Sequence, residues 1–173
     1  MPGPSNEIYC LDADALVNIQ ICYPKDIRRI DHYAKKGKVV IAEGVYREIS
    51  RKADRLKETV QNWQRKYGAV IWLLEPALQR ELSRMENAYG NAITLGNQTR
   101  KGFWSSKSGR RAADSQVVAV CKVRGYAAVS NDEAVQNACH IENVPCFTWQ
   151  EFYRRMKQDF TGQGSLFDKQ THV

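Results

Sequence analysis

The sequence predicts an α/β domain built around a mainly parallel β-sheet. Short apolar segments that suit buried strands alternate with longer segments of helical periodicity along most of the chain. The 173 residues, of which 43% are hydrophobic and 26% charged, suffice for one domain with its own core. Acidic residues follow several of the apolar segments, where sheets of this kind usually bind their ligands.

Proline and glycine residues mark where many of the predicted elements begin and end. Pro24 and Pro76 suit the first turn of a helix, and Gly68, Gly90 and Gly125 suit the position after its last turn. In chain order we expect a strand at 7–11, a helix at 12–22, a helix at 24–36, a strand at 38–42, helical sequence at 43–67, an apolar strand or extended segment at 69–74, a helix at 76–89, a helix at 110–124, a strand at 126–130, a helix at 132–143, a strand at 144–148 and a helix at 149–158.

Two regions carry no such pattern. Residues 91–109 are rich in Gly, Ser, Asn and Thr and predict a long loop. The polar segment at the C-terminal end predicts a frayed terminus. We therefore expect a single domain over residues 1–158 and a flexible C-terminal tail over 159–173.

Charge and cysteine content narrow the class of protein. The net charge of +7 is typical of a domain that meets a polyanion, nucleic acid first. No apolar run approaches the length of a membrane-spanning helix, and "MPGPSNE" does not resemble a signal peptide, so we expect a cytoplasmic protein without membrane contact.

The cysteines are odd in number, form no CxxC pair and mostly have apolar neighbours. This pattern predicts reduced core residues rather than a disulfide framework or a zinc site. The cysteines are Cys10, Cys22, Cys121, Cys139 and Cys146.

Carboxylates follow three of the predicted strands. Asp12 and Asp14 come directly after the first strand, Glu48 lies about one helical turn beyond the second, and Asp132 follows the strand at 126–130. Because parallel strands end at the same edge of a sheet, we expect these acids to meet there. Each also has a plainer explanation: Asp12 and Asp132 suit helix N-caps, Asp14 suits a first turn, and Glu48 suits solvent.

Asp114 is the most informative single residue. Val117, Val118 and Cys121 lie three, four and seven positions further on, so Asp114 shares the apolar face of its predicted helix. A carboxylate buried without a partner costs on the order of several kcal/mol. The partner is either a buried Arg or Lys, such as Arg110 or Arg111 one turn earlier, or a cation held together with other acids.

Grouped carboxylates repel one another, and a divalent cation removes that repulsion. Oxygen ligands without His or Cys are typical of Mg²⁺ or Mn²⁺. Such an ion suits phosphoryl chemistry, because it neutralises a phosphate oxygen and lowers the pKa of a bound water. The pattern therefore favours a metal-dependent enzyme acting on a phosphate ester.

The order of these residues resembles the PIN domain, a family of metal-dependent ribonucleases. "YCLDADALV" carries an Asp after the first strand, "VYREI" a Glu on an early helix, "AADSQVVAVCKVRG" an Asp on a later helix, and "AAVSND" an Asp after the following strand. The match extends over residues 8–150. The resemblance implies a three-layer α/β/α fold with a mainly parallel central sheet, and hydrolysis of RNA phosphodiester bonds.

The resemblance also implies roles for individual residues. The catalytic quartet would be Asp12, Glu48, Asp114 and Asp132, with Mg²⁺ or Mn²⁺ bound by the three aspartates.

Three further residues are candidates for supporting this quartet. Asp14 stands where the family often carries Asn, Ser or Thr, so it is either a metal ligand or a neighbour that orients one. Ser130, two positions before the last Asp, is a candidate for orienting water or metal. Asn18 lies one turn after Asp14 and could support it, with plain solvation as the alternative.

A basic segment fits an RNA substrate. "RKGFWSSKSGRR", residues 100–111, holds five basic residues, no acid and two aromatic residues. Basic side chains would hold the RNA backbone and an aromatic ring could stack on an unpaired base, whereas the alternative is a solvated loop whose Trp packs on the core. The predicted RNA-binding residues are Arg100, Lys101, Trp104, Lys107, Arg110 and Arg111.

Many small PIN proteins are VapC-type toxins that a small antitoxin protein inhibits. The resemblance therefore implies either a toxin of this type or an uncharacterised PIN-like branch, since this chain is longer than the compact members. Candidate partners are RNA, an antitoxin and a second copy of the chain.

Two other readings stay open. A phosphatase of the haloacid dehalogenase type also places DxD after its first strand, with Asp12 as nucleophile. That family needs a later Lys and a closing acidic pair, which "SNDEA" matches poorly, and it leaves Asp114 unexplained. A PIN-like fold kept only for binding RNA or protein is the third reading.

Overall fold

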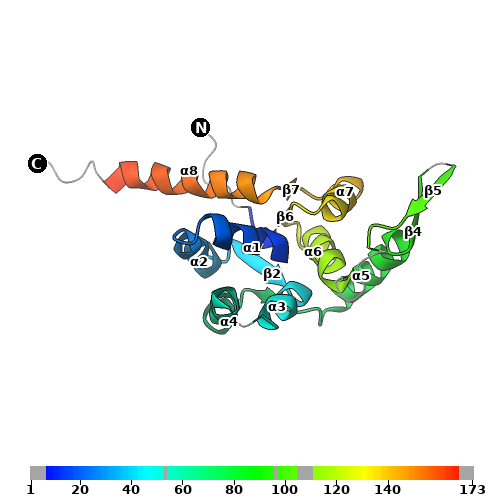
Figure 1. The fold of residues 1–173 in the computed structure, drawn as a ribbon, viewed down its shortest axis with the longest axis horizontal. Helices are drawn as coiled ribbons and strands as arrows, with labels where there is room; N and C mark the ends of the chain where they lie inside the picture. Colours follow the sequence, from blue (N-terminus) through cyan, green and yellow to red (C-terminus); the bar gives the residue numbers. More distant parts are fainter. Residues whose placement is uncertain (1–6, 53, 96, 105–110, 168–173) are drawn as a thin grey trace, which may run out of the picture.

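The computed structural model describes residues 7–52, 54–95, 97–104 and 111–167. Its centre is a sheet of five parallel strands in the order β3-β2-β1-β6-β7. The strands are β1 (Tyr9–Leu11), β2 (Val39–Ala42), β3 (Val70–Ile71), β6 (Ala127–Val129) and β7 (Cys146–Phe147). Helices flank this sheet in the predicted three-layer α/β/α arrangement, which is confirmed (Figure 1).

Most helices begin and end close to where the sequence predicts. They are α1 (Ala13–Cys22), α2 (Ile27–Lys35), α3 (Glu43–Ser50), α4 (Arg55–Tyr67), α5 (Pro76–Tyr89), α6 (Arg111–Arg124), α7 (Glu133–Ile141) and α8 (Trp149–Phe167). Gly68 ends α4 in a left-handed conformation at φ +63°, and its N–H donates to the carbonyls of the last turn.

Three boundaries differ from the prediction. The helix after Pro24 begins only at Ile27. The helical sequence at 43–67 is divided into α3 and α4, because the Asp54 side chain caps a new helix by accepting from Lys57 N at 3.0 Å. Helix α8 continues to Phe167, beyond the predicted end at 158; residues 168–173 of the predicted tail lie outside the described residues.

The segment at 91–104 is not the loop that the sequence predicted. Strands β4 (Ala92–Leu95) and β5 (Gln98–Lys101) pair in an antiparallel hairpin, which projects from one end of the molecule (Figure 1). Every side chain of β5 is exposed, so its sequence shows no alternation of apolar and polar residues. Residues 105–110 of the predicted loop lie outside the described residues.

Strand β1 lies at the centre of the sheet, with β2 on one side and β6 on the other. Tyr9 pairs with Val39 and Ala127, and Leu11 pairs with Val129. The chain leaves β1 and β6 at the same edge, which places the residues after these two strands side by side.

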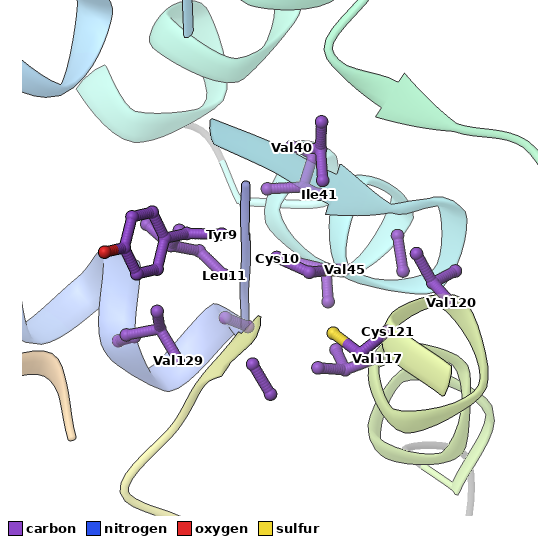
Figure 2. Packing of buried hydrophobic residues seen from close by; sticks show 14 of the residues in the cluster. Tyr9, Cys10, Leu11, Val40, Ile41, Val45, Val117, Val120, Cys121 and Val129 are labelled. Atoms are coloured by element: carbon purple, nitrogen blue, oxygen red, sulfur yellow. The ribbon is translucent and has the colours of Figure 1, made fainter. Parts of the chain in front are cut away.

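The core fills the space between the sheet and its helices. Helix α6 contacts β1, β2 and β6 and is flanked by α3, α5 and α7. Figure 2 shows Val117 and Cys121 of α6 packed with Cys10 of β1 and Val45 of α3, all of them buried. This apolar face holds α6 against the sheet and fixes Asp114 at its N-terminal end. Among the helices of the described residues, none has the length and apolar character needed to cross a membrane.

Candidate active site

Asp12 is the buried centre of the site, with only 4% of its surface exposed. It follows β1 and caps α1, with Oδ1 accepting from Ala13 N at 2.7 Å and Oδ2 accepting from Ser130 Oγ at 2.8 Å. Burial raises its pKa to about 7, and the negative charges of Asp114 and Asp132 add to this rise. The predicted capping role and the predicted grouping with other acids are therefore both present.

Ser130 connects two of the acids. Besides donating to Asp12, its Oγ accepts from Asp132 N at 3.1 Å, and the residue is fully buried after β6. Asp132 is half-buried and caps α7, since its Oδ1 accepts from Ala134 N and Val135 N at 2.9 and 3.2 Å. Ser130 thus links Asp12, which follows β1, to Asp132, which follows β6.

Helix α6 brings Asp114 to the same place. Asp114 is 8% exposed in its first turn, and its charge acts on Asp12 more strongly than that of Asp132 does. Arg110, one of the two arginines just before it, lies outside the described residues, and the side chain of Arg111 is not among those described. The structure therefore brings Asp12, Asp114 and Asp132 within electrostatic reach of one another.

Glu48 lies on α3, a helix that packs against α6. Gly44 N donates to Gln116 Oε1 at 2.6 Å, and a Cβ at Gly44 would lie 2.9 Å from Ala113 Cα. Glu48 is four residues after Gly44, so it faces the same side of α3 one turn further on, and it is half-buried. The place of Glu48 in the quartet stays a prediction.

Asp14 and Asn18 form a pair on the outer side of α1. Asp14 is exposed, and Asn18 Nδ2 donates to both its Oδ1 and its carbonyl oxygen at 2.9 Å. Asp12 is buried by contrast, and the acids that raise its pKa include Asp114 and Asp132. The structure thus separates the second acid of the DxD pair from the buried group, and any supporting role of this pair stays a prediction.

The donor set suits a hard divalent cation. Burial, together with the charges of Asp114 and Asp132, favours the protonated form of Asp12, and a bound cation would favour its ionised form instead. In the described part of the chain, no three Asp, Glu, His or Cys side chains stand close enough to form a ready-made metal site. Asp132 Oδ1 is already engaged by the N–H groups of α7.

The predicted RNA-binding residues divide into three groups. Arg100 and Lys101 are exposed on β5, as a backbone contact requires. Trp104 is fully buried, so the prediction that it meets RNA is wrong: the alternative of a Trp packed on the core holds. Lys107 and Arg110 lie outside the described residues, and Arg111 begins α6.

Sequence reasoning missed two residues near the site. Gln116 is buried and joins α3 to α6 through Gly44, and a polar residue two positions after Asp114 was the only signal of it. Phe103 is the half-buried aromatic residue of the basic segment and lines a pocket of about 360 Å³ that also includes Asp132. Phe103 and Trp104 are adjacent aromatic residues, and the sequence alone does not indicate which of them is buried.

Comparison with solved structures places the fold. VapBC-1 from nontypeable Haemophilus influenzae matches with a TM-score of 0.50 and 13% identity, over 83% of this chain and 98% of that one. PAE2754 from Pyrobaculum aerophilum matches with a TM-score of 0.48 and 14% identity, over 88% and 98% of the two chains. VapBC2 from Rickettsia felis, bound to a promoter DNA fragment, also has 0.48 and 14%, over 82% and 98%.

The sequence comparisons add the family. No curated protein matches the chain. A family model described as a domain of unknown function, DUF4411, matches residues 9–160, which span the whole sheet and the acidic site. The chain therefore belongs to the DUF4411 family, and this member has the fold of a PIN domain.

Proposed function

We propose that this protein is a metal-dependent endoribonuclease. The observation that supports this best is the group around Asp12: a buried carboxylate, bonded to Ser130, whose pKa is raised to about 7 by burial and by Asp114 and Asp132. An arrangement that costs stability when no cation is bound is typical of a functional site. The PIN fold of the chain supports a nuclease over the other readings.

Asp12, Asp114 and Asp132 are the residues that would hold Mg²⁺ or Mn²⁺. When bound, the ion would supply charge neutralisation at the phosphate and a more acidic bound water. Asp12 would hold the ion in its ionised form, with Ser130 Oγ donating to Oδ2 and fixing the orientation of the carboxylate. Glu48, arriving from α3, is proposed to accept a proton from the attacking water.

An RNA substrate agrees with the charge of the chain. The net charge is +7, and Arg100 and Lys101 are exposed on the hairpin next to a pocket that Asp132 lines. Basic side chains there contact the backbone of a single strand and position it over the acids.

We further propose that the protein acts as the toxin of a toxin–antitoxin pair in the cytoplasm. The support is the resemblance to VapC-type PIN proteins that the acidic residues carry. A small antitoxin protein and a second copy of the chain are the proposed protein partners.

Three outcomes separate the candidate functions. Purified protein is incubated with RNA and Mg²⁺ or Mn²⁺, with and without EDTA, beside Asp114→Asn. Metal-dependent cleavage that this variant loses supports the nuclease. RNA binding without any cleavage supports a binding module, and an aspartyl-phosphate trapped with a fluoride analogue supports the phosphatase.

A further inference from the structure

A pocket next to the acidic site is lined from two distant parts of the chain. Lys101, Gly102 and Phe103 come from the end of the β4–β5 hairpin, and Asp132, Glu133, Ala134 and Asn137 come from the start of α7. Its volume of about 360 Å³ is at the lower end of the range for small-molecule sites. Because Asp132 belongs to both, whatever fills the pocket lies against the candidate metal site.

The hairpin wall of the pocket is fixed in place. Gly102 N donates to Asn91 O at 2.9 Å, and Phe103 N donates to Tyr89 O at 2.8 Å. The Phe103 ring packs against Tyr89 at 5.7 Å between ring centroids and against Trp104 at 6.2 Å. A Cβ at Gly102 would lie 2.5 Å from Gly90 O, so only glycine allows this close approach. The half-buried Phe103 ring is therefore held rigidly at the wall of the pocket.

The polar side chains of the pocket are available to a ligand. Lys101, Glu133 and Asn137 are exposed, and within the described residues no hydrogen bond engages their side chains. Two carboxylates against one lysine would repel a phosphate group placed inside the pocket. An uncharged group with N–H donors would instead satisfy the carboxylate of Glu133 and the amide of Asn137.

We propose that this pocket binds one unpaired nucleobase of the RNA, beside the cleaved phosphodiester, and favours guanine. Phe103 packs on the base, Glu133 and Asn137 bond its edge, and Lys101 contacts the adjacent backbone phosphate. Guanine presents two neighbouring N–H donors to a carboxylate, whereas uracil presents one. This inference rests on the proposed ribonuclease function and names the base that the same site selects.

The test separates binding from cleavage. The full chain carrying Asp12→Asn is titrated onto fluorescein-labelled oligouridylate and onto the same strand with a single guanosine, and affinity is read from anisotropy. We expect the guanosine strand to bind about tenfold more tightly, since a stacked and bonded base contributes about that much. Equal affinity for the two strands overturns the proposal.

Matched variants locate the effect. Phe103→Leu and Asn137→Ala should lose the preference for guanosine, and Phe103→Tyr should keep it. Gln61→Ala, at an exposed position of α4, should leave the preference unchanged. Asn137 is exposed, so Asn137→Ala keeps the fold even if Phe103→Leu disturbs the packing around Trp104. A preference that survives both Phe103→Leu and Asn137→Ala contradicts the pocket.

The two proposals fail in different ways. If the unmodified protein cuts RNA without regard to the neighbouring base, and Asn137→Ala cuts as well as it does, the ribonuclease stands and the pocket is rejected. If no metal supports cleavage while the guanosine preference and its loss in Asn137→Ala remain, the pocket stands and the ribonuclease is rejected.

Discussion

At the scale of single residues, two buried acids behave in opposite ways. Asp12 lies among other acids, and burial with their charges raises its pKa to about 7. Glu142 is also buried, which acts to raise its pKa, but hydrogen bonds from Arg84, Tyr89 and Lys122 outweigh burial and hold the pKa at about 2. The grouping of Asp12 with other acids lowers stability when no cation is bound. The cluster around Glu142 joins α5, α6 and α7 and stabilises the fold.

Asp12→Asn should stabilise the metal-free protein. The folded pKa of Asp12 lies above its unfolded value of 3.8, so folding favours the protonated form and stability falls as pH rises from about 4 to about 7. The variant removes this loss and should be about 2–4 kcal/mol more stable at pH 8 in EDTA. Urea unfolding at several pH values measures it, with Asp54→Asn as an exposed control. If the stabilities of the variant and the unmodified protein changed with pH in the same way, the raised pKa of Asp12 would be contradicted.

Glu142→Gln should show the reverse. The folded pKa of Glu142 lies below its ordinary value of 4.5, so its stabilisation is present above pH 4.5 and is lost as pH falls toward 2. At pH 7 we expect the variant to lose about 2–3 kcal/mol, because Arg84 and Lys122 lose a charged partner. Thermal melting between pH 2 and 7 measures it, and an unchanged melting temperature at pH 7 would show that the cluster contributes nothing.

At the scale of elements, the close contact between α3 and α6 sets the distance across the site. Gly44 N donates to the buried Gln116, and one turn later α3 carries Glu48. The helices and strands themselves were predictable, because apolar periodicity and glycine or proline boundaries report local structure. The contact between α3 and α6 was not predictable, because a glycine in a helical segment gives no sign of which helix packs against it.

Gly44→Ala should therefore destabilise the protein. Alanine ordinarily stabilises a helix relative to glycine. Here its Cβ would lie 2.9 Å from Ala113 Cα, and the helices must separate at a cost of about 1–3 kcal/mol. Chemical denaturation gives the stability, and RNA cleavage should fall as well because Glu48 moves with α3. A stability equal to or above that of the unmodified protein would mean that the two helices yield easily.

The β4–β5 hairpin shows where element prediction fails. Both strands are short and β5 is exposed throughout, so no buried face imposes a pattern on the sequence. A two-stranded hairpin of this kind is marginal alone, and here Phe103 N fastens its end to Tyr89 O of α5. The burial of Trp104 rather than Phe103 follows from the same fastening, which is a tertiary effect.

At the scale of the whole molecule, the parallel sheet assembles the site. Asp12 lies far in the sequence from Ser130 and Asp132, and the pairing of β1 with β6 brings them together. The parallel sheet and the meeting of acids at its strand ends were predictable together, because a parallel sheet places all its carboxyl ends at one edge. The sequence could not predict that Asp14 is exposed while Asp12 is buried, because the burial of residues at the start of a helix depends on how that helix packs.

The most direct test of the proposed function is the metal dependence of RNA cleavage by the unmodified protein and by Asp12→Asn. A fluorescence-quenched single-stranded RNA is followed over a titration of Mg²⁺ and of Mn²⁺, with Asp54→Asn as the matched control. We expect cleavage that requires the ion, is abolished by EDTA and falls by more than about a hundredfold in Asp12→Asn alone. Cleavage that persists in EDTA, or that Asp12→Asn retains in full, would contradict the assignment of this site.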